Sequence, residues 1–307
     1  MLVARRLLAL SALLVPFLVP AQGGGSDAPR VTLARATPRA GDRLMTPALS
    51  EDEAVGLSSP GHGPHTAFHP ATAPRELLLS FDDGPDLRGT PLILDELDRR
   101  GLKAIFFVTG WRLKGQRPED VARRDLVRKI AAHGHLVANH TMSHHDLCQN
   151  PTEQASEIDA NTELIAETTG VRPLLFRSPY GAFCHSLEAA LAARELPDIG
   201  WNLDPQDWKS DNEDAVFAYL ANKLAHLKGR GILLLHDTHL ASVHALPRVL
   251  DWLARENARD ARAGRPPVNV IDYGAILPPR SIAPSGLPEL LGALLADAAG
   301  SVERHLH

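Results

Sequence analysis

From Glu76 onward, short apolar runs alternate with longer amphipathic segments. Seven of these runs have the length and composition of buried strands. They cover residues 76–81, 104–109, 135–139, 174–177, 199–203, 231–236 and 268–272. Strands that alternate with helical segments predict a parallel sheet in an α/β fold. The chain has 307 residues, enough for a single barrel-like catalytic domain with extensions.

Helix start and stop signals lie between several of these runs. Thr90-Pro91 should open a helix that Gly101 closes, and Pro118 should open another that stops near Gly134. Asn212 leads into a third helical segment that ends by Gly229. The three leucines of that segment repeat at helical spacing and are expected in the core: Leu220, Leu224 and Leu227.

Reactive side chains follow the predicted strands at their carboxyl ends. They are Asp82 and Asp83 after the first strand, His140 after the third, Arg177 at the end of the fourth, Asp204 and Asp207 after the fifth, and His236 at the end of the sixth. The carboxyl ends of all strands in a parallel barrel lie on one face, where active sites are assembled from several loops. We therefore expect these residues to converge on one site.

His140, His144 and an aspartate at another strand end, Asp82 or Asp83, are the expected ligands of one divalent metal ion. His140 and His144 are four residues apart, which on a helical turn places both imidazoles on one face. An Asp from another strand end completes three protein ligands and leaves a position open for water. Water bound to such a metal ionises near neutral pH and becomes a nucleophile.

Five ordered blocks resemble the polysaccharide deacetylases with a NodB-homology domain, carbohydrate esterase family 4. They are Ser80-Phe81-Asp82-Asp83-Gly84-Pro85, His140-Thr141-Met142-Ser143-His144, Arg177-Ser178-Pro179-Tyr180, Asp204-Pro205-Gln206-Asp207-Trp208 and Leu234-Leu235-His236. They lie within residues 76–277. The resemblance implies a distorted (β/α)7 barrel, similar to a TIM barrel, that removes acetyl groups from a carbohydrate.

The resemblance also implies a role for each site residue. Asp83, His140 and His144 would bind the metal, and Asp82 would be the general base, with Arg177 keeping it ionised. His236 would protonate the departing group, oriented by Asp207. The backbone N–H of Tyr180 would stabilise the oxyanion. Trp208 and Leu234 would line the pocket for the acetyl methyl group.

The metal and the substrate stay open at this stage. Two histidines and a carboxylate suit Zn²⁺, while Co²⁺, Ni²⁺ or Mn²⁺ could use the same ligands. The leading substrate is an N-acetylglucosamine polymer such as peptidoglycan, a chitin-like polymer or poly-N-acetylglucosamine. The alternatives are an O-acetyl esterase acting on acetylated xylan and a non-catalytic carbohydrate-binding protein of the same fold.

The net charge of −5, without a long basic run, argues against a nucleic-acid partner. Residues 1–21 have the pattern of a signal peptide, with Arg5 and Arg6 before an apolar stretch; an uncleaved membrane anchor is the alternative. We expect a flexible linker over 22–75, the deacetylase domain over 76–277 and a C-terminal extension over 278–307. The mature protein should be secreted or periplasmic, with no stable membrane insertion.

Cys148 and Cys184 are the two cysteines of the chain. In an oxidising compartment they could form a disulfide, and the alternative is two separate buried thiols.

Overall fold

The structure is a computed structural model that describes residues 74–277. The predicted signal peptide, all but the last two residues of the predicted linker, and the predicted C-terminal extension lie outside the described residues.

A parallel sheet forms the centre of the domain. Its strands are β1 (Glu76–Asp82), β2 (Ile105–Val108), β3 (Leu136–Asn139), β4 (Arg230–His236) and β5 (Asn269–Ile271). β1 pairs with β4 along its whole length, with β5 over its first residues and with β2 over its last, and β3 pairs with β2. All of these pairings are parallel, which confirms the predicted α/β class.

Two of the seven predicted strands are reduced to single bridges. In the segment 174–177, Phe176 bridges Asn139 on one side and Asp198 on the other, and in the segment 199–203, Leu203 bridges Leu233 of β4. Prolines flank both segments, and a proline has no N–H to donate to a neighbouring strand. Parallel pairings and single bridges still form a circuit that leads from β3 through these segments back to β4.

Six helices cover the strands: α1 (Gly89–Arg100), α2 (Pro118–Ala132), α3 (Gln154–Thr169), α4 (His185–Ala192), α5 (Glu213–Ala225) and α6 (Leu240–Arg262). Two predicted helix boundaries are confirmed. Gly101 ends α1 in a left-handed conformation with φ 65°, and Pro118 is the first residue of α2. The Asn212 side chain accepts a hydrogen bond from the backbone N–H of Ala215 and so caps α5. α5 ends at Ala225, before Gly229.

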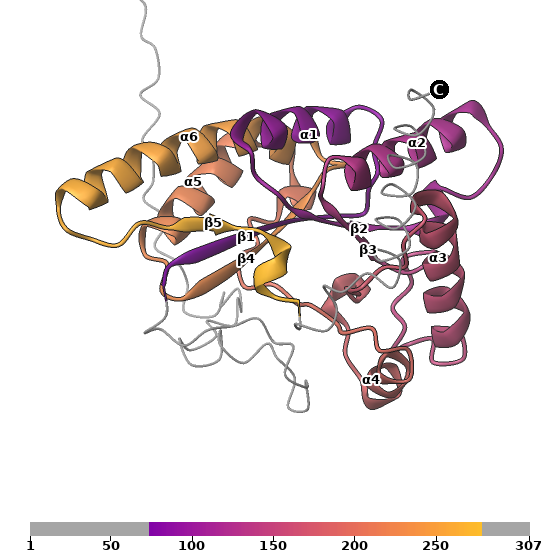
Figure 1. Cartoon of the computed structure of the whole chain (residues 1–307). Helices are drawn as coiled ribbons and strands as arrows, with labels where there is room; N and C mark the ends of the chain where they lie inside the picture. The colour runs from indigo at the N-terminus through magenta and orange to yellow at the C-terminus, as the bar shows by residue number, and fades with distance from the viewer. Residues whose placement is uncertain (1–73, 278–307) are drawn as a thin grey trace, which may run out of the picture. The chain divides into compact units, whose positions relative to one another are not determined.

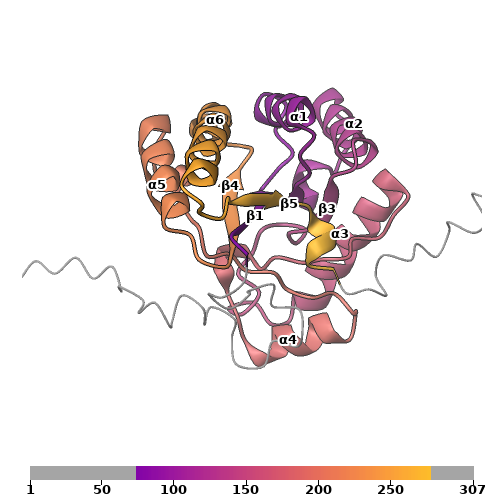
Figure 2. The ribbon, with the colours of Figure 1, turned by 60° about the vertical axis from the view of Figure 1, so that its left-hand side comes forward.

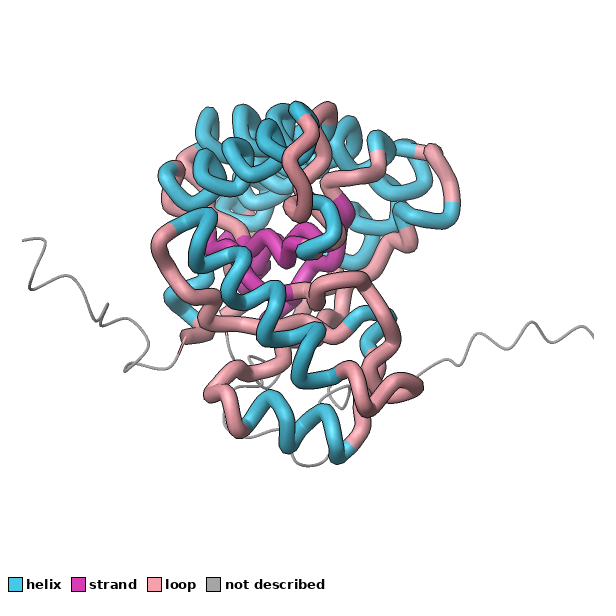
Figure 3. The backbone as a smooth tube through the Cα atoms, turned by 90° about the vertical axis from the view of Figure 1, so that its right-hand side faces the viewer, coloured by secondary structure: helices cyan, strands magenta, loops and turns pink. Residues whose placement is uncertain are grey.

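The helices follow one another around the sheet. Figure 1 shows α1, α5 and α6 over one side of the strands, and the turned view in Figure 2 shows the series α5, α6, α1, α2 and α3 curving around them. Neighbours in this series are in contact, and α3 also contacts α4. Figure 3 shows the strands surrounded by helices, with one helix crossing in front of them. Leu220 and Leu224 are fully buried, as expected, and Leu227 packs partly buried against the same core.

Alternation along the strands separates two apolar clusters and positions the site. Leu77, Leu79 and Phe81 of β1 belong to the cluster packed under the helices. Leu78 belongs to a second cluster, which contains alternate residues of the neighbouring strands. Because side chains alternate along a strand, Asp82 lies on the same face as Leu78, at the carboxyl end of β1. Polar side chains therefore stand above an apolar layer inside the circuit of strands.

Among the helices of residues 74–277, none combines the length and the apolar character needed to cross a membrane.

Candidate active site

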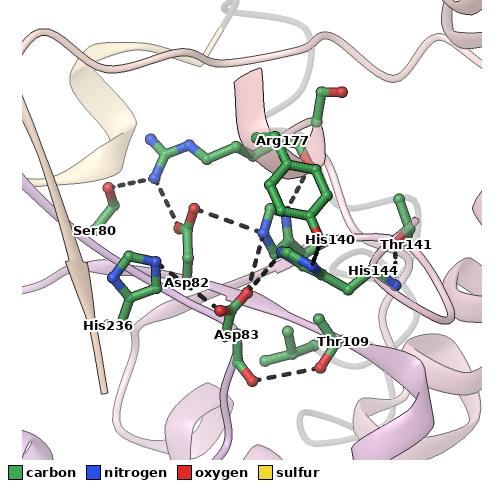
Figure 4. Close-up of polar contacts among 12 residues, drawn as sticks. Ser80, Asp82, Asp83, Thr109, His140, Thr141, His144, Arg177 and His236 are labelled. Atoms are coloured by element: carbon green, nitrogen blue, oxygen red, sulfur yellow. Dashed lines mark hydrogen bonds and ion pairs between the residues drawn. The ribbon is translucent and has the colours of Figure 1, made fainter. Parts of the chain in front are cut away.

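Asp83, His140 and His144 meet at the carboxyl ends of β1 and β3. The Nε2 atoms of His140 and His144 lie 3.3 and 3.0 Å from Oδ1 of Asp83 (Figure 4). One ligand atom from each residue lies within 4.8 Å of the others, so the three could hold one metal ion. The structure therefore brings together the three residues predicted as ligands.

The ligand atoms of these three residues are suited to binding a cation. Nδ1 of His140 lies 2.6 Å from the carbonyl oxygen of Arg177, which can only accept, so Nδ1 carries the hydrogen. In a neutral imidazole, the lone pair of Nε2 then points toward Oδ1 of Asp83, a buried oxygen that accepts no hydrogen bond in the described part of the chain. Electron-rich atoms facing one another need a positive charge between them, and a divalent metal supplies it.

The ionisation of Asp83 and that of His140 depend on each other. Burial alone would raise the pKa of Asp83, but the imidazoles of His140 and His144 hold that pKa well below its usual range. Burial disfavours the charged form of His140, while Asp82 and Asp83 raise its pKa overall. Asp83 is thus a carboxylate, the form in which an aspartate binds a metal ion.

The loop that carries the histidines is not helical, so the expected helical turn is wrong. Thr141 and His144 have left-handed backbones, with φ 64° and 60°, and Asp83 has φ 70°. Side-chain hydrogen bonds stabilise the loop: Thr141 N–H donates to Oδ1 of Asn139, and His144 N–H donates to Oγ1 of Thr141. Non-glycine residues rarely adopt this conformation, and it is concentrated at functional sites. A four-residue spacing fits a strained loop as well as a helix.

Asp82 faces Arg177 on the inner side of the circuit of strands. Nη1 of Arg177 donates to Oδ1 of Asp82 and to the hydroxyl of Ser80, both at 2.8 Å. Nε of Arg177 donates to the carbonyl of Ile199, and its fully buried guanidinium lies over the ring of Phe107. The other oxygen of Asp82 lies 3.7 Å from Nε2 of His140. This arrangement leaves Asp82 with one anchored oxygen and one facing the predicted metal ligands.

His236 forms the opposite side of the site with Asp207. The backbone N–H of His236 lies 2.8 Å from Oδ2 of Asp207, and its ring Nδ1 lies 2.7 Å from Oδ1. Nε2 of His236 points toward Asp83, 3.9 Å from Oδ2 (Figure 4). Burial alone would lower the pKa of His236, but Asp207 and the carboxylates of the site raise it to about 9. His236 can therefore hold a proton at neutral pH.

Tyr180, Trp208 and Leu234 lie on three segments around this centre. Tyr180 is in the short turn η2 (Pro179–Gly181), with φ 61° and a largely exposed side chain. Trp208 is half-exposed in η3 (Asp207–Lys209), directly after Asp207. Leu234 is buried in β4, on the same face of the strand as His236. The aromatic residues lie at the surface, whereas Leu234 lies inside.

The sequence has relatives with known names. The family model described as polysaccharide deacetylase matches residues 69–197. The chain is 36% identical over 165 residues to a chitooligosaccharide deacetylase of Bradyrhizobium sp., covering 53% of this chain and 71% of that protein. It belongs to the polysaccharide deacetylase family, carbohydrate esterase family 4.

Two further comparisons agree with this family. The chain is 33% identical over 189 residues to the peptidoglycan-N-acetylglucosamine deacetylase of Bacillus cereus, covering 60% of this chain and 65% of that protein, which is just under two thirds. A solved structure of a peptidoglycan N-acetylglucosamine deacetylase in complex with 4-naphthalen-1-yl-N-oxidanyl-benzamide superposes with a TM-score of 0.56 at 27% identity, over 68% of this chain and 91% of that chain.

A disulfide links Cys148 and Cys184 in this polysaccharide deacetylase domain. It joins the loop after the predicted metal ligands to the residue before α4, and both sulfurs lie beside the apolar cluster that includes Leu147 and Leu187. The predicted disulfide is therefore confirmed, and the two cysteines are not separate buried thiols.

The structure adds residues that sequence reasoning missed. Ser242 of α6 donates to Oδ2 of Asp207, and Asn161 of α3 donates to Oδ1 of Asn139 beneath the histidine loop. Asp237 is buried beside Gly84, accepts a hydrogen bond from Thr90, and has a pKa that burial raises to about 7. The position of Asp237 directly after His236 could have marked it as a site residue in the sequence. Ser242 and Asn161 lie within helices, and nothing in the sequence marked them as site residues.

Proposed function

We propose that the protein is a metal-dependent hydrolase that removes acetyl groups from N-acetylglucosamine units of a polysaccharide. One observation carries the proposal: two buried ion pairs flank the ligand set Asp83, His140 and His144. The Asp82–Arg177 pair reaches within 3.7 Å of His140, and the Asp207–His236 pair reaches within 3.9 Å of Asp83. A purely structural metal site would need neither a free base nor a free acid beside it.

The proposed reaction is amide hydrolysis, in which an N-acetyl group and water give a free amine and acetate. A divalent ion bound by Asp83, His140 and His144 would lower the pKa of a bound water and polarise the acetyl carbonyl. Zn²⁺ suits two imidazoles and a carboxylate best. The residues around this ion would then move the protons.

Asp82 would accept the proton of the attacking water. Its anchored oxygen is fixed by Arg177, and its other oxygen faces the ligand set, so the base is both ionised and aimed. His236 would donate a proton to the departing nitrogen from Nε2, because its Nδ1–H is bonded to Asp207. The backbone N–H of Tyr180 would stabilise the negative oxygen of the tetrahedral intermediate.

An extended carbohydrate fits the surface around the site. Trp111, Tyr180 and Trp208 are the exposed aromatic residues among the exposed large hydrophobic side chains of the described chain. Each lies in a short turn beside a proposed site residue: Trp111 N–H donates to the carbonyl of Met142 in the histidine loop, and the other two follow Arg177 and Asp207. Flat apolar surfaces with polar neighbours are typical of ligand sites, and the named relatives act on N-acetylated glycans.

The protein would act outside the cytoplasm, in the cell envelope or as a secreted enzyme. The Cys148–Cys184 disulfide supports this location, because such bonds persist in oxidising compartments.

Acetate release from a panel of substrates tests the proposed function. Protein reconstituted with Zn²⁺ should release acetate from N-acetylated chito-oligosaccharides or peptidoglycan, and Asp82→Asn should release none. Acetate release from acetylated xylan alone would show that the substrate is an ester and not the proposed amide. Metal-loaded protein that binds these glycans but releases acetate from none would overturn the enzymatic assignment.

A further inference from the structure

The two proposed histidine ligands are held in different ways. Nδ1 of His140 is bonded to a buried backbone carbonyl, that of Arg177. Nδ1 of His144 lies 3.2 Å from the hydroxyl oxygen of Tyr180, at the exposed edge of the site. One orienting partner belongs to the backbone, and the other belongs to a side chain that can be replaced.

The direction of the second hydrogen bond follows from the metal site. For Nε2 of His144 to bind a metal, its lone pair must be free, so the hydrogen of the neutral ring must be on Nδ1. The hydroxyl oxygen of Tyr180 then accepts from Nδ1. A histidine ligand usually donates its second N–H in this way, which fixes both its tautomer and its ring orientation.

The local backbone holds Tyr180 against His144. The turn at Tyr180 is closed by Gly181 N–H donating to the carbonyl of Ser178, and Tyr180 itself has a left-handed backbone with φ 61°. The two rings meet edge to face, with centroids 4.8 Å apart at 71°. Of the two proposed histidine ligands, His144 is the more exposed, with 23% of its side chain accessible against 3% for His140. His144 therefore depends more on a specific partner for its orientation.

We infer that the hydroxyl group of Tyr180 is a positioning group that holds His144 with Nε2 toward the metal and so increases metal affinity. The inference rests on the proposed metal site and adds a side-chain role to the backbone role proposed for Tyr180. It also links the two ligands through one segment, because residues 177 to 180 supply the partners of both Nδ1 atoms.

Zinc affinity measured by competition with a chromophoric chelator tests the inference. Tyr180→Phe keeps the ring and the backbone N–H and removes only the hydroxyl. It should weaken Zn²⁺ binding about tenfold, the lower end of the effect of losing such a partner. Tyr180→Ala should weaken binding to a similar extent, because it removes the same hydroxyl. The Co²⁺ absorption spectrum should shift in Tyr180→Phe if the geometry at His144 changes.

Tyr273→Phe is the matched control. Tyr273 lies in η4 (Tyr273–Ala275) and packs against the apolar cluster that contains Leu78. It should bind Zn²⁺ like the wild type. Wild-type affinity in Tyr180→Phe together with a loss in Tyr180→Ala would assign the effect to the ring and overturn the inference. Wild-type protein that binds no Zn²⁺, or His144→Ala that binds it equally well, would instead overturn the proposed metal site.

Discussion

Asp207 accepts two hydrogen bonds from His236, one from the backbone N–H and one from the ring Nδ1–H, at 2.8 and 2.7 Å. The pair fixes the imidazole of His236 with Nε2 toward the predicted metal ligands and raises its pKa to about 9. In the proposed mechanism, His236 would give this proton to the departing nitrogen.

Asp207→Asn should disable this donor. The amide keeps the shape of the side chain but removes the charge that favours the protonated imidazole, so kcat should fall by about 100-fold or more. Metal content should stay unchanged, because Asp207 is not among the proposed ligands. Steady-state acetate release and elemental analysis measure the two effects. Asp214→Asn, which removes an exposed carboxylate on α5, is the control. A kcat within about twofold of the wild type would remove Asp207 from the mechanism.

His140→Ala and Asp82→Asn should separate metal binding from chemistry. His140→Ala removes a proposed ligand and should reduce both metal content and acetate release. Asp82→Asn removes the proposed base and should leave the metal bound while turnover is abolished. The two variants are compared by metal analysis after gel filtration and by acetate release. Turnover retained in Asp82→Asn would show that another group takes the proton.

The disulfide should contribute to stability. Cys148 and Cys184 are 36 residues apart, and closing a loop of this length stabilises a fold by about 3–4 kcal/mol through the entropy of the unfolded chain. The double variant Cys148→Ser, Cys184→Ser should lower the free energy of unfolding by about that amount in urea titrations. Reductant should destabilise the wild type and leave the double variant unaffected. Equal sensitivity of both proteins to reductant would contradict this account.

His135 should make the metal-free protein less stable in acid. Burial and the nearby Lys103 lower the pKa of His135 from 6.5 to about 4, and Nδ1 accepts a hydrogen bond from Ala104 N–H. As pH falls from about 6.5 to 4, the unfolded chain binds this proton and the folded chain does not. The free energy of unfolding should therefore decrease over this range, by on the order of 1–3 kcal/mol.

His135→Asn places its Oδ1 where Nδ1 accepts from Ala104 N–H and cannot titrate, so its stability should fall less steeply with acid than that of the wild type. The exposed His226→Gln serves as the control and should follow the wild type. Parallel curves for wild type and His135→Asn in urea titrations from pH 4 to 7 would show that His135 does not cause the acid sensitivity.

The fold was predictable where local signals are strong. Continuous apolar runs indicated β1 and β4, and Gly101 and Asn212 marked a helix end and a helix start correctly. The segments around Phe176 and Leu203 have the same apolar character, yet each makes only single bridges. Whether such a run becomes a full strand depends on its neighbours and on nearby prolines, which periodicity does not describe.

The site was predictable as a set of residues but not as a geometry. Strand ends brought Asp82, Asp83, His140, Arg177 and His236 together, as parallel topology requires. Nothing in the sequence indicated the left-handed backbone at Thr141 and His144, because it is maintained by hydrogen bonds that their N–H groups donate to the side chains of Asn139 and Thr141. The contact between Ser242 and Asp207 joins residues far apart in the chain and depends on tertiary packing alone.

We propose that one metal ion at Asp83, His140 and His144 gives this chain its deacetylase activity. This proposal is tested most directly by stripping the protein with a chelator, titrating Zn²⁺ back, and measuring bound metal and acetate release from N-acetylated chito-oligosaccharides at each step. Activity should be absent without metal and should rise in proportion to bound metal up to one equivalent. Acetate release that does not depend on metal, or one bound equivalent without release from any acetylated glycan, would contradict the account.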